Sequence, residues 1–158
     1  MKELRVVGIG QFAVCHSPEQ LSCLGLGSCV AIILYDPQTR VGGMVHVLLP
    51  KAPQKVDVEG KYADTGGRRP VREMTINGAS KDRVVAKLVG GAQMFKNLNV
   101  QVANIGRFNV LEARKALREL QIRFVAEDIE GDRGRSARLD SATGQVTVQK
   151  VFSPTRVI

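Results

Sequence analysis

Residues 30–49 read VAIILYDPQTRVGGMVHVLL, and the architecture of the chain is organised around this stretch. Two apolar, β-branched runs, 30–35 and 41–49, flank the segment 36–39, whose composition Asp-Pro-Gln-Thr is typical of a turn. Strands that are apolar nearly throughout are usually buried on both faces. We therefore expect a central β-hairpin that other elements cover on both sides.

The rest of the chain supplies strands and two helices around this hairpin. The other predicted strands are short: 4–9, 12–15, 84–89, 122–128, 137–140 and 145–151. Helices are expected at 69–77 and at 109–120, where the residues NVLE at 109–112 have the form of a capping box. Residues 50–61 are predicted to form an exposed loop. No repeat or linker divides the chain, so the prediction is α/β: a single-domain layered sandwich over residues 1–158, with a mixed β-sheet core and flanking helices.

The composition places the chain among globular proteins. It has 158 residues, 44% hydrophobic and 24% charged, which is enough to build a core without disulfides or metal. No apolar run approaches the ~20 residues that span a bilayer, and residues 1–5 lack the apolar segment of a signal peptide. Three cysteines, an odd number, make a poor disulfide framework. We expect a cytoplasmic protein with reduced thiols.

The positive charge is unevenly distributed. The formal net charge is +8, and because the basic and acidic residues of positions 1–50 cancel, all of it falls on residues 51–158. Such a surface favours an acidic partner, although a solvated basic face without a partner explains it equally well. An RNA-binding function is disfavoured, because only 4% of the residues are aromatic and none is Trp.

The segment LGLGSC at 24–29 is the first candidate for chemistry. It places two glycines before Cys29, at the start of a predicted strand. A backbone without Cβ atoms can direct N–H groups at a substrate carbonyl, so Gly27 and Ser28 are candidates for an oxyanion hole. An ordinary glycine-containing loop is the alternative.

The register of the hairpin brings a base toward this cysteine. If residues 36–39 form a four-residue loop, Tyr35 pairs with Arg40 and Cys29 lies directly opposite His46. Directly opposed residues have Cβ atoms about 4.5–5.5 Å apart, within reach of a thiol–imidazole hydrogen bond that favours the thiolate. The alternative is a core histidine beside a buried, inert thiol.

Six short motifs, in order along the chain, carry a resemblance to a known family. They are GLGSCVA at 25–31, HVLLP at 46–50, KYADT at 61–65, GGAQMF at 90–95, NIG at 104–106, and AED at 126–128 with GR at 134–135. Together they resemble CheD, the chemoreceptor glutamine deamidases of bacterial chemotaxis.

The resemblance implies a fold, a reaction and a site. The implied fold is an α/β sandwich related to the cysteine deamidase domain of cytotoxic necrotizing toxins. The implied reaction converts receptor glutamine side chains to glutamate, sometimes with methylester hydrolysis, and needs no metal or other cofactor. The nucleophile corresponds to Cys29 and the base to His46. The third catalytic position, a Thr in the family, falls on Cys23, whose thiol is a weaker hydrogen-bond donor than a hydroxyl. The neighbouring Ser22 is expected to face the other way.

The resemblance also implies partners. These are the cytoplasmic helices of chemoreceptors as substrate and a CheC-type phosphatase of the response regulator. One departure lies near the substrate-facing motifs: Phe108 stands where the family usually has Arg, and Arg107 precedes it. We expect Arg68, Arg69 and Arg72 to form a basic rim around the Cys29 site that attracts acidic receptor helices.

Two alternatives stay open at this point. A non-enzymatic adaptor that binds the phosphatase would retain the fold and lose turnover, because Cys23 replaces Thr. A zinc site would use the sulfur and imidazole ligands, although their spacing lacks the short Cys-x2–4-Cys pair of structural zinc sites. The residues concerned are Cys15, His16, Cys23, Cys29 and His46.

Overall fold

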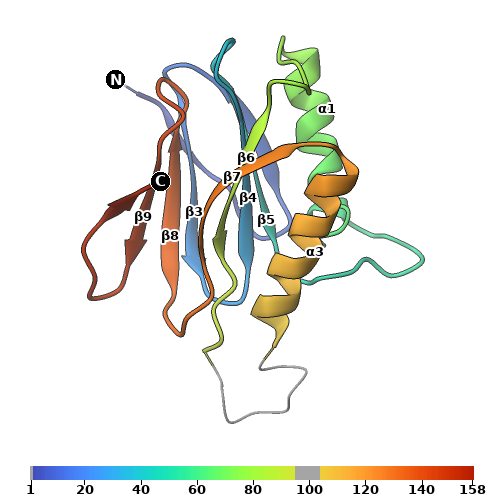
Figure 1. Ribbon diagram of the computed structural model, residues 1–158, viewed down its shortest axis with the longest axis vertical. Helices are drawn as coiled ribbons and strands as arrows, with labels where there is room; N and C mark the ends of the chain where they lie inside the picture. Colours follow the sequence, from blue (N-terminus) through green and yellow to red (C-terminus); the bar gives the residue numbers. More distant parts are fainter. Residues whose placement is uncertain (1, 95–103) are drawn as a thin grey trace.

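The predicted hairpin lies at the centre of the molecule. Figure 1 shows the computed structural model, which describes residues 2–94 and 104–158. Strands β4 (Val30–Asp36) and β5 (Val41–Val47) pair antiparallel, with Asp36 opposite Val41. The hairpin is therefore confirmed, but the predicted pairing of Tyr35 with Arg40 is wrong. The Asp36 carboxylate accepts hydrogen bonds from the turn, so Asp36 ends the strand and Arg40 closes the turn with a positive φ of 59°.

In the described residues, ten strands form two mixed sheets. Sheet B has the order β2-β5-β4-β6-β7, in which only β6 and β7 are parallel. Sheet A has the order β1-β3-β8-β9-β10, in which only β1 and β3 are parallel. The remaining strands are β1 (Leu4–Val6), β2 (Phe12–His16), β3 (Gln20–Leu26), β6 (Val85–Gly90), β7 (Arg123–Ile129), β8 (Arg135–Asp140), β9 (Val146–Lys150) and β10 (Arg156–Val157).

The two sheets and the helices α1 and α3 are stacked in three layers. Helices α1 (Arg68–Ile76) and α3 (Ile105–Glu119) cover one face of sheet B, and sheet A covers the other (Figure 1). A short 3-10 turn, η1 (Glu59–Lys61), lies in the loop after β5. None of the helices described is long and apolar enough to cross a membrane. The α/β layered sandwich with a mixed β core and flanking helices is confirmed.

The two faces of sheet B build two separate cores. Ile32 and Val45 pack with Met74 and Leu117 of the helices, whereas Ile33 and the other face of sheet B pack against sheet A. The alternation along β4 produces this division, because successive side chains of a strand point to opposite faces. The residues that fill the space between the sheets include Cys29 and Cys23.

A buried carboxylate ties the two sheets together. Asp128, at the end of β7, lies 2.5 Å from Nη1 of Arg135 on β8, and both side chains are 1% exposed. Lys150 and Arg156 also approach this carboxylate, at 3.1 and 3.0 Å. The AED and GR motifs therefore meet in an ion-pair cluster that joins sheet B to sheet A.

The structure corrects the predicted starts and ends of several elements. Helix α3 begins at Ile105, so the predicted capping box is wrong: Asn109 lies inside the helix and is fully buried. Strand β3 has no counterpart among the predicted strands. The alternation of its side chains between the two faces is interrupted by Gly25, at φ +62°, and by a register shift between Cys23 and Leu26. Because of this interruption, the sequence does not show the period-two pattern that predicts a strand. The terminal strand β10 was also not predicted.

Candidate active site

Cys29 lies in the short connection between β3 and β4, and its side chain is 8% exposed. The three carbonyl groups of residues 27–29 are all held by hydrogen bonds. The N–H of Ala92 donates to the Gly27 oxygen at 2.8 Å, and the N–H of Gly91 donates to the Cys29 oxygen at 2.9 Å. Nδ2 of Asn109 donates to the Ser28 oxygen at 2.8 Å. The loop that carries the thiol is therefore fixed through its acceptors.

The N–H donors of the same loop differ from its acceptors. Within the part of the chain that the structure describes, no N–H of residues 27–29 donates to a backbone carbonyl outside the strand ladders. The backbone N–H of Cys29 acts to lower the pKa of its own thiol. An N–H beside the nucleophile can stabilise an oxyanion that forms there. The oxyanion roles of Gly27 and Ser28 stay predictions.

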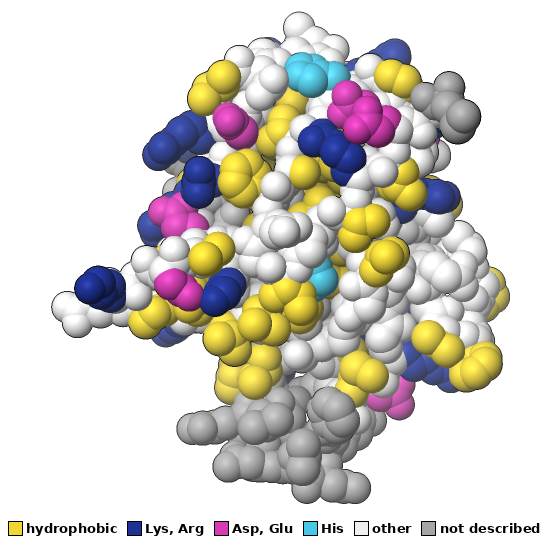
Figure 2. Space-filling view, turned by 180° about the vertical axis from the view of Figure 1, so that it is seen from behind, with side chains coloured by type: hydrophobic (Ala, Val, Ile, Leu, Met, Phe, Trp, Pro, Cys, Tyr) yellow, Lys and Arg dark blue, Asp and Glu magenta, His cyan; other side chains and the backbone are white. Residues whose placement is uncertain are grey.

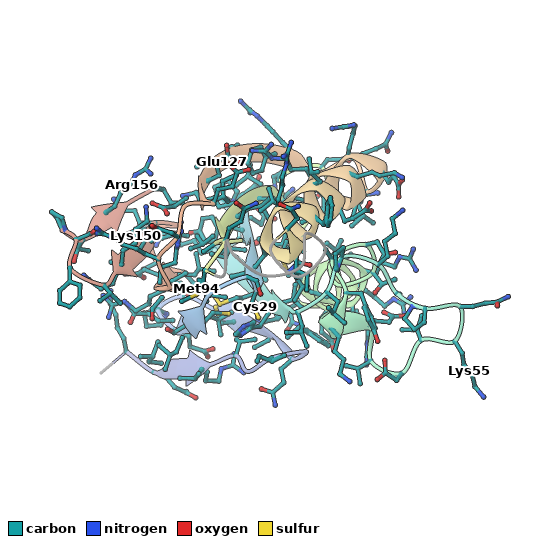
Figure 3. All side chains as sticks on the ribbon, turned by 90° about the horizontal axis from the view of Figure 1, so that it is seen from below. Cys29, Lys55, Met94, Glu127, Lys150 and Arg156 are labelled. Carbon is teal, nitrogen blue, oxygen red and sulfur yellow. The ribbon has the colours of Figure 1, made fainter. Side chains whose placement is uncertain are left out.

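Gly90 is required for this loop to sit where it does, and Gly27 lies against a methionine side chain. Gly90 has a φ of +117°, and a Cβ there would lie 2.2 Å from the carbonyl oxygen of Cys29. A Cβ on Gly27 would lie 2.8 Å from Sδ of Met94. Figure 3 shows Met94 and Cys29 close together at this end of the molecule, whereas the loop with Lys55 extends away from them. The turn after β6 and the loop before β4 therefore pack backbone against backbone.

His46 lies on the same face of sheet B as Cys29, but not directly opposite it. The observed partner of His46 on β4 is Ala31, so the predicted direct opposition is wrong. Cys29 precedes Ala31 by two residues, which places it diagonally from His46 on the same face. Diagonal neighbours across a sheet are about 7–8 Å apart, still within reach of longer side chains. Both residues thus face the space between the two sheets.

The imidazole of His46 is held by a backbone carbonyl. Its Nδ1 lies 3.2 Å from the oxygen of Val7, and the N–H of Val7 donates in turn to the oxygen of Ser22 at 2.7 Å. A carbonyl can only accept, so Nδ1 carries the proton and Nε2 carries the lone pair. Nε2 is buried and has no hydrogen-bond partner among the described residues. It is therefore the nitrogen available to act as a base.

Burial keeps both groups of the pair neutral at rest. It raises the pKa of the Cys29 thiol, against the smaller effect of its own N–H. It lowers the pKa of His46, against the smaller effect of the Val7 carbonyl. Both directions favour a neutral thiol and a neutral imidazole, and the predicted thiolate at neutral pH stays a prediction. This arrangement instead suits general-base catalysis, in which the imidazole takes the thiol proton during attack.

Cys23 lies on β3 and is fully buried between the sheets. Burial, together with the nearby Cys29 thiol, raises the pKa of Cys23 to about 12. The hydrogen bond recorded for His46 goes to Val7 and not to Cys23, so the structure gives the orienting contact to a carbonyl. A catalytic role for Cys23 stays a prediction. Ser22 faces the outer side of sheet A, where it lines a shallow pocket, as predicted.

An apolar groove lies beside the site. Its cavity volume is about 540 Å³, and it is lined by Leu49, Pro50, Lys51, Phe108, Leu111 and Glu112. Hydrophobic side chains gather there on the face shown in Figure 2, next to the projecting loop that follows β5. Lys51 and Glu112 lie 3.7 Å apart at its edge. Asn109, the neighbour of Phe108, donates to the carbonyl oxygens of Ser28 and Leu48, so the groove lies next to the segments that carry Cys29 and His46.

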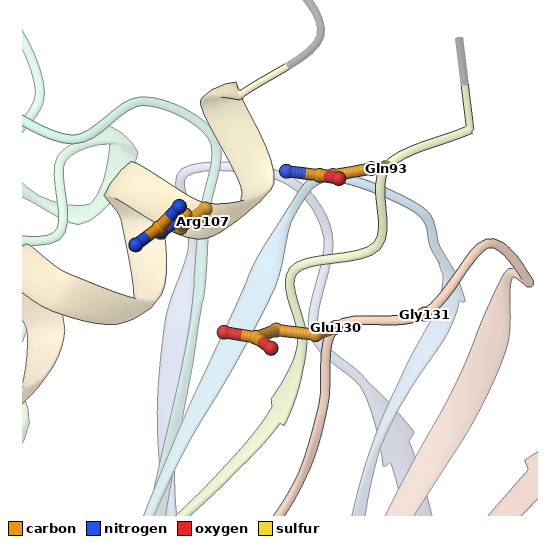
Figure 4. A pocket seen from close by; sticks show the side chains of 4 residues that line it. All are labelled: Gln93, Arg107, Glu130 and Gly131. Carbon is orange, nitrogen blue, oxygen red and sulfur yellow. The ribbon is translucent and has the colours of Figure 1, made fainter. Parts of the chain in front are cut away.

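A second pocket, of about 320 Å³, is polar. Gln93, Arg107, Glu130 and Gly131 line it (Figure 4). The two neighbours on α3 therefore face different surroundings: Arg107 lines the polar pocket and Phe108 the apolar groove. The departure from the family pattern at position 108 thus makes the groove apolar where an Arg would make it cationic.

The predicted basic rim on α1 is not supported at Arg69, whereas Arg68 lines a pocket with Lys51 and Glu112. Val71 and Met74 of this helix pack on the face of sheet B that is turned away from Cys29. Arg69 lies over the ring of Phe12, 5.4 Å from its centroid, and so belongs to the outer surface of β2. The alternation of side chains on sheet B separates α1 from the thiol, which a linear motif could not reveal.

The residues considered for zinc are spread over the fold. His16 is exposed and lies 3.0 Å from Asn77, and its neighbour Cys15, at the same end of β2, is buried. Across residues 2–94 and 104–158, no three His, Cys, Asp or Glu side chains are placed to hold a metal ion. The site therefore depends on Cys29, His46 and the backbone around them.

Comparison with known proteins identifies the family. A sequence model described as CheD chemotactic sensory transduction matches residues 48–150, a span that begins after His46. The chain is similar over nearly its whole length to the chemoreceptor glutamine deamidase CheD of Thermotoga maritima, with 44% identity over 93% of this chain and 92% of the relative. It is also similar to the probable chemoreceptor glutamine deamidase CheD of Pyrococcus horikoshii, with 48% identity over 96% of this chain and 94% of the relative. A third relative, the probable chemoreceptor glutamine deamidase CheD of Desulforamulus reducens, is 44% identical over 96% of this chain and 93% of the relative. This chain belongs to the CheD family.

Proposed function

We propose that this protein is a chemoreceptor glutamine deamidase, which hydrolyses the side-chain amide of receptor glutamines to glutamate and releases ammonia. Family membership supports the reaction. The observation that carries the proposal is the placement of Cys29 and His46 on one face at the end of the β4–β5 hairpin. In this proposal residues 1–158 act as one deamidase domain in the cytoplasm.

The first half of the reaction forms a thioester. Nε2 of His46 takes the proton of the Cys29 thiol as the sulfur attacks the glutamine amide carbon. The carbonyl oxygen gains negative charge and is stabilised by N–H groups of the loop 27–29. The imidazolium then gives its proton to the leaving nitrogen, the carbon–nitrogen bond breaks, and ammonia departs.

The second half regenerates the thiol. Neutral His46 takes a proton from water, whose oxygen attacks the thioester carbon. The carbon–sulfur bond breaks, the proton passes to the sulfur, and glutamate is released. Hydrolysis of a receptor methylester would follow the same steps, with methanol as the first leaving group. Neither half requires a cofactor.

The substrate is presented by the cytoplasmic helices of the receptor. A helix that lies in the apolar groove would place its exposed side chains next to the end of β5. The groove can accept an apolar helix face, since Phe108 is 43% and Leu111 is 48% exposed. The edge pair formed by Lys51 and Glu112 would remain in contact with polar positions of the helix.

The alternative function is a non-enzymatic adaptor that binds a CheC-type phosphatase. It is favoured by one observation, the presence of Cys23 at the position where the family has Thr. A protein of this kind would bind its partner through the same end of the molecule and would release no ammonia.

Incubation with cytoplasmic receptor fragments from the same genome separates the two functions. Mass spectrometry should find glutamine converted to glutamate at particular positions with the wild type and no conversion with Cys29→Ala. Binding of the phosphatase by a wild type that leaves every receptor glutamine intact would establish the adaptor instead.

A further inference from the structure

We infer that Asn109 is a positioning residue that holds the nucleophile loop and the strand of the base in register. The inference rests on the proposed function, because it concerns how the Cys29–His46 pair is assembled. Asn109 itself touches neither side chain and acts through the backbone on either side of them.

Its amide nitrogen bridges the two halves of the site. Nδ2 donates to the carbonyl oxygen of Ser28 at 2.8 Å and to that of Leu48 at 3.1 Å. Ser28 immediately precedes the nucleophile, and Leu48 follows the base by two residues. A single fully buried side chain therefore contacts both segments that carry the chemistry.

The two segments need such a bridge because their own pairing has ended. The last pair of the β4–β5 ladder joins Val30 to Val47, so Ser28 and Leu48 lie beyond it. Both present carbonyl oxygens, which can only accept hydrogen bonds and cannot bind each other. A primary amide supplies two N–H donors on one atom and satisfies both. Because both neighbours are acceptors, the orientation of this amide is also fixed.

Packing does not explain the presence of an amide here. Oδ1 of Asn109 is buried and has no hydrogen-bond partner among the residues that the structure describes. A buried acceptor without a partner is unfavourable, and an apolar side chain of the same size would avoid it. The amide is therefore best explained by what Nδ2 does for Ser28 and Leu48.

Helix α3 holds Asn109 in a fixed position relative to the loop. A Cβ on Gly106 would lie 2.5 Å from the oxygen of Ala92, so the helix starts in contact with the turn after β6. The same turn donates to the carbonyls of Gly27 and Cys29 through Ala92 and Gly91. All three anchors of the nucleophile loop thus come from one rigid support.

Two variants of similar size test the inference. Asn109→Leu keeps the volume and removes both donors, and Asn109→Asp keeps the shape and places a buried carboxylate against two carbonyls. We expect kcat for receptor deamidation to fall about 10- to 100-fold with an unchanged KM, because small displacements of reacting groups have effects of this size. In Asn109→Asp, protonation restores one donor, so its activity relative to wild type should rise as the pH falls.

A control on the same helix separates positioning from stability. Leu117 is buried on α3 and packs in the core between the helices and sheet B. Leu117→Val should lower the melting temperature and leave kcat unchanged. Asn109 variants with kcat within twofold of wild type would overturn the inference, whatever their melting temperatures.

A measurement without receptor keeps this inference distinct from the proposed function. The rate at which iodoacetamide labels Cys29, followed as a function of pH, reports the surroundings of the thiol. We expect the Asn109 variants to change this pH profile, and Leu117→Val to preserve it. If the wild type deamidates no receptor, the proposed function fails, while unchanged labelling profiles in both Asn109 variants would separately overturn the positioning role.

Discussion

The imidazole of His46 and the carbonyl of Val7 join the two sheets at the site. His46 belongs to β5 in sheet B, and Val7 follows β1 in sheet A, yet Nδ1 lies 3.2 Å from the Val7 oxygen. The contact fixes both the ring and its tautomer, since the proton must be on Nδ1. Sheet A thereby determines which nitrogen of the base is free, and sheet B determines where the base lies relative to Cys29.

Removing either member of the pair should abolish deamidation. Cys29→Ala and His46→Ala should each lower kcat by a factor of about 10³ or more, because the two groups act as a unit in acyl transfer. Ammonia release and mass spectrometry of the receptor fragment measure this. Cys15→Ala is the matched control, since Cys15 is also buried between the sheets but far along β2 from the site. Substantial turnover by a folded Cys29→Ala protein would exclude the covalent mechanism.

The resting site should behave as a neutral thiol. Burial raises the pKa of Cys29, so the thiolate fraction at neutral pH should be below that of an ordinary cysteine with a pKa of about 8.5. Iodoacetamide labelling should therefore be slow at pH 7 and rise continuously above pH 8.5. Cys29 should still react before Cys15 and Cys23, which are fully buried. A rate that is constant between pH 5 and 8 would instead indicate a thiolate–imidazolium pair.

Position 23 should tune the acidity of the nucleophile. Cys29 lies close enough to Cys23 to contribute to the raised pKa of Cys23, about 12, although burial is the larger cause. A hydroxyl donates a stronger hydrogen bond than a thiol, and valine donates none. The Cys29 labelling profile should therefore move to lower pH in Cys23→Thr and to higher pH in Cys23→Val, and deamidation rates should follow the same order. Equal profiles in all three proteins would make position 23 a packing site.

The apolar groove should contribute to substrate binding and not to chemistry. Phe108→Asp places a charge where an apolar helix face is proposed to lie, so KM for the receptor fragment should rise about tenfold with kcat unchanged. Ile76→Asp is the control, because Ile76 is 73% exposed at the end of α1. An unchanged KM in Phe108→Asp would place the receptor on another surface.

The sequence predicts which two side chains lie at the site, Cys29 and His46, better than it predicts how they lie relative to each other. Local composition was sufficient to find the hairpin, the cysteine and the histidine, because turn residues and apolar runs are short-range signals. The register was missed by one position on each strand, since Asp36 ends β4 by binding the turn and leaves residues 37–40 as the loop. Val7 was missed because a backbone carbonyl has no sequence signature. Asn109 was misassigned to a helix start, because its partners are 81 and 61 residues away.

The hairpin that carries the site should be sensitive to acid through Asp36. Its carboxylate is 0% exposed and accepts from Arg83 at 3.0 and 3.2 Å and from the N–H groups of Ser80 and Gln38, both at 2.9 Å. Burial alone would raise the pKa of Asp36, but these hydrogen bonds outweigh it and hold the pKa well below its usual range. A lowered folded-state pKa means that the stabilisation is complete above the unfolded value of about 3.9 and is lost as the pH falls toward the folded value.

Chemical denaturation of Asp36→Asn should show this loss directly. At pH 7 we expect the free energy of unfolding to fall by about 2–3 kcal/mol, less than for a fully buried pair because Arg83 is 35% exposed. The difference from wild type should shrink below pH 4, where the carboxylate of the unfolded wild-type chain becomes protonated while that of the folded protein stays ionised. Asp57→Asn is the control, since Asp57 pairs with Lys61 on the exposed surface, and its unfolding curve should match that of wild type. The difference in the free energy of unfolding between wild type and Asp36→Asn could instead stay constant from pH 7 down to the acid transition. That result would show that the charge of the Asp36 carboxylate does not contribute to stability.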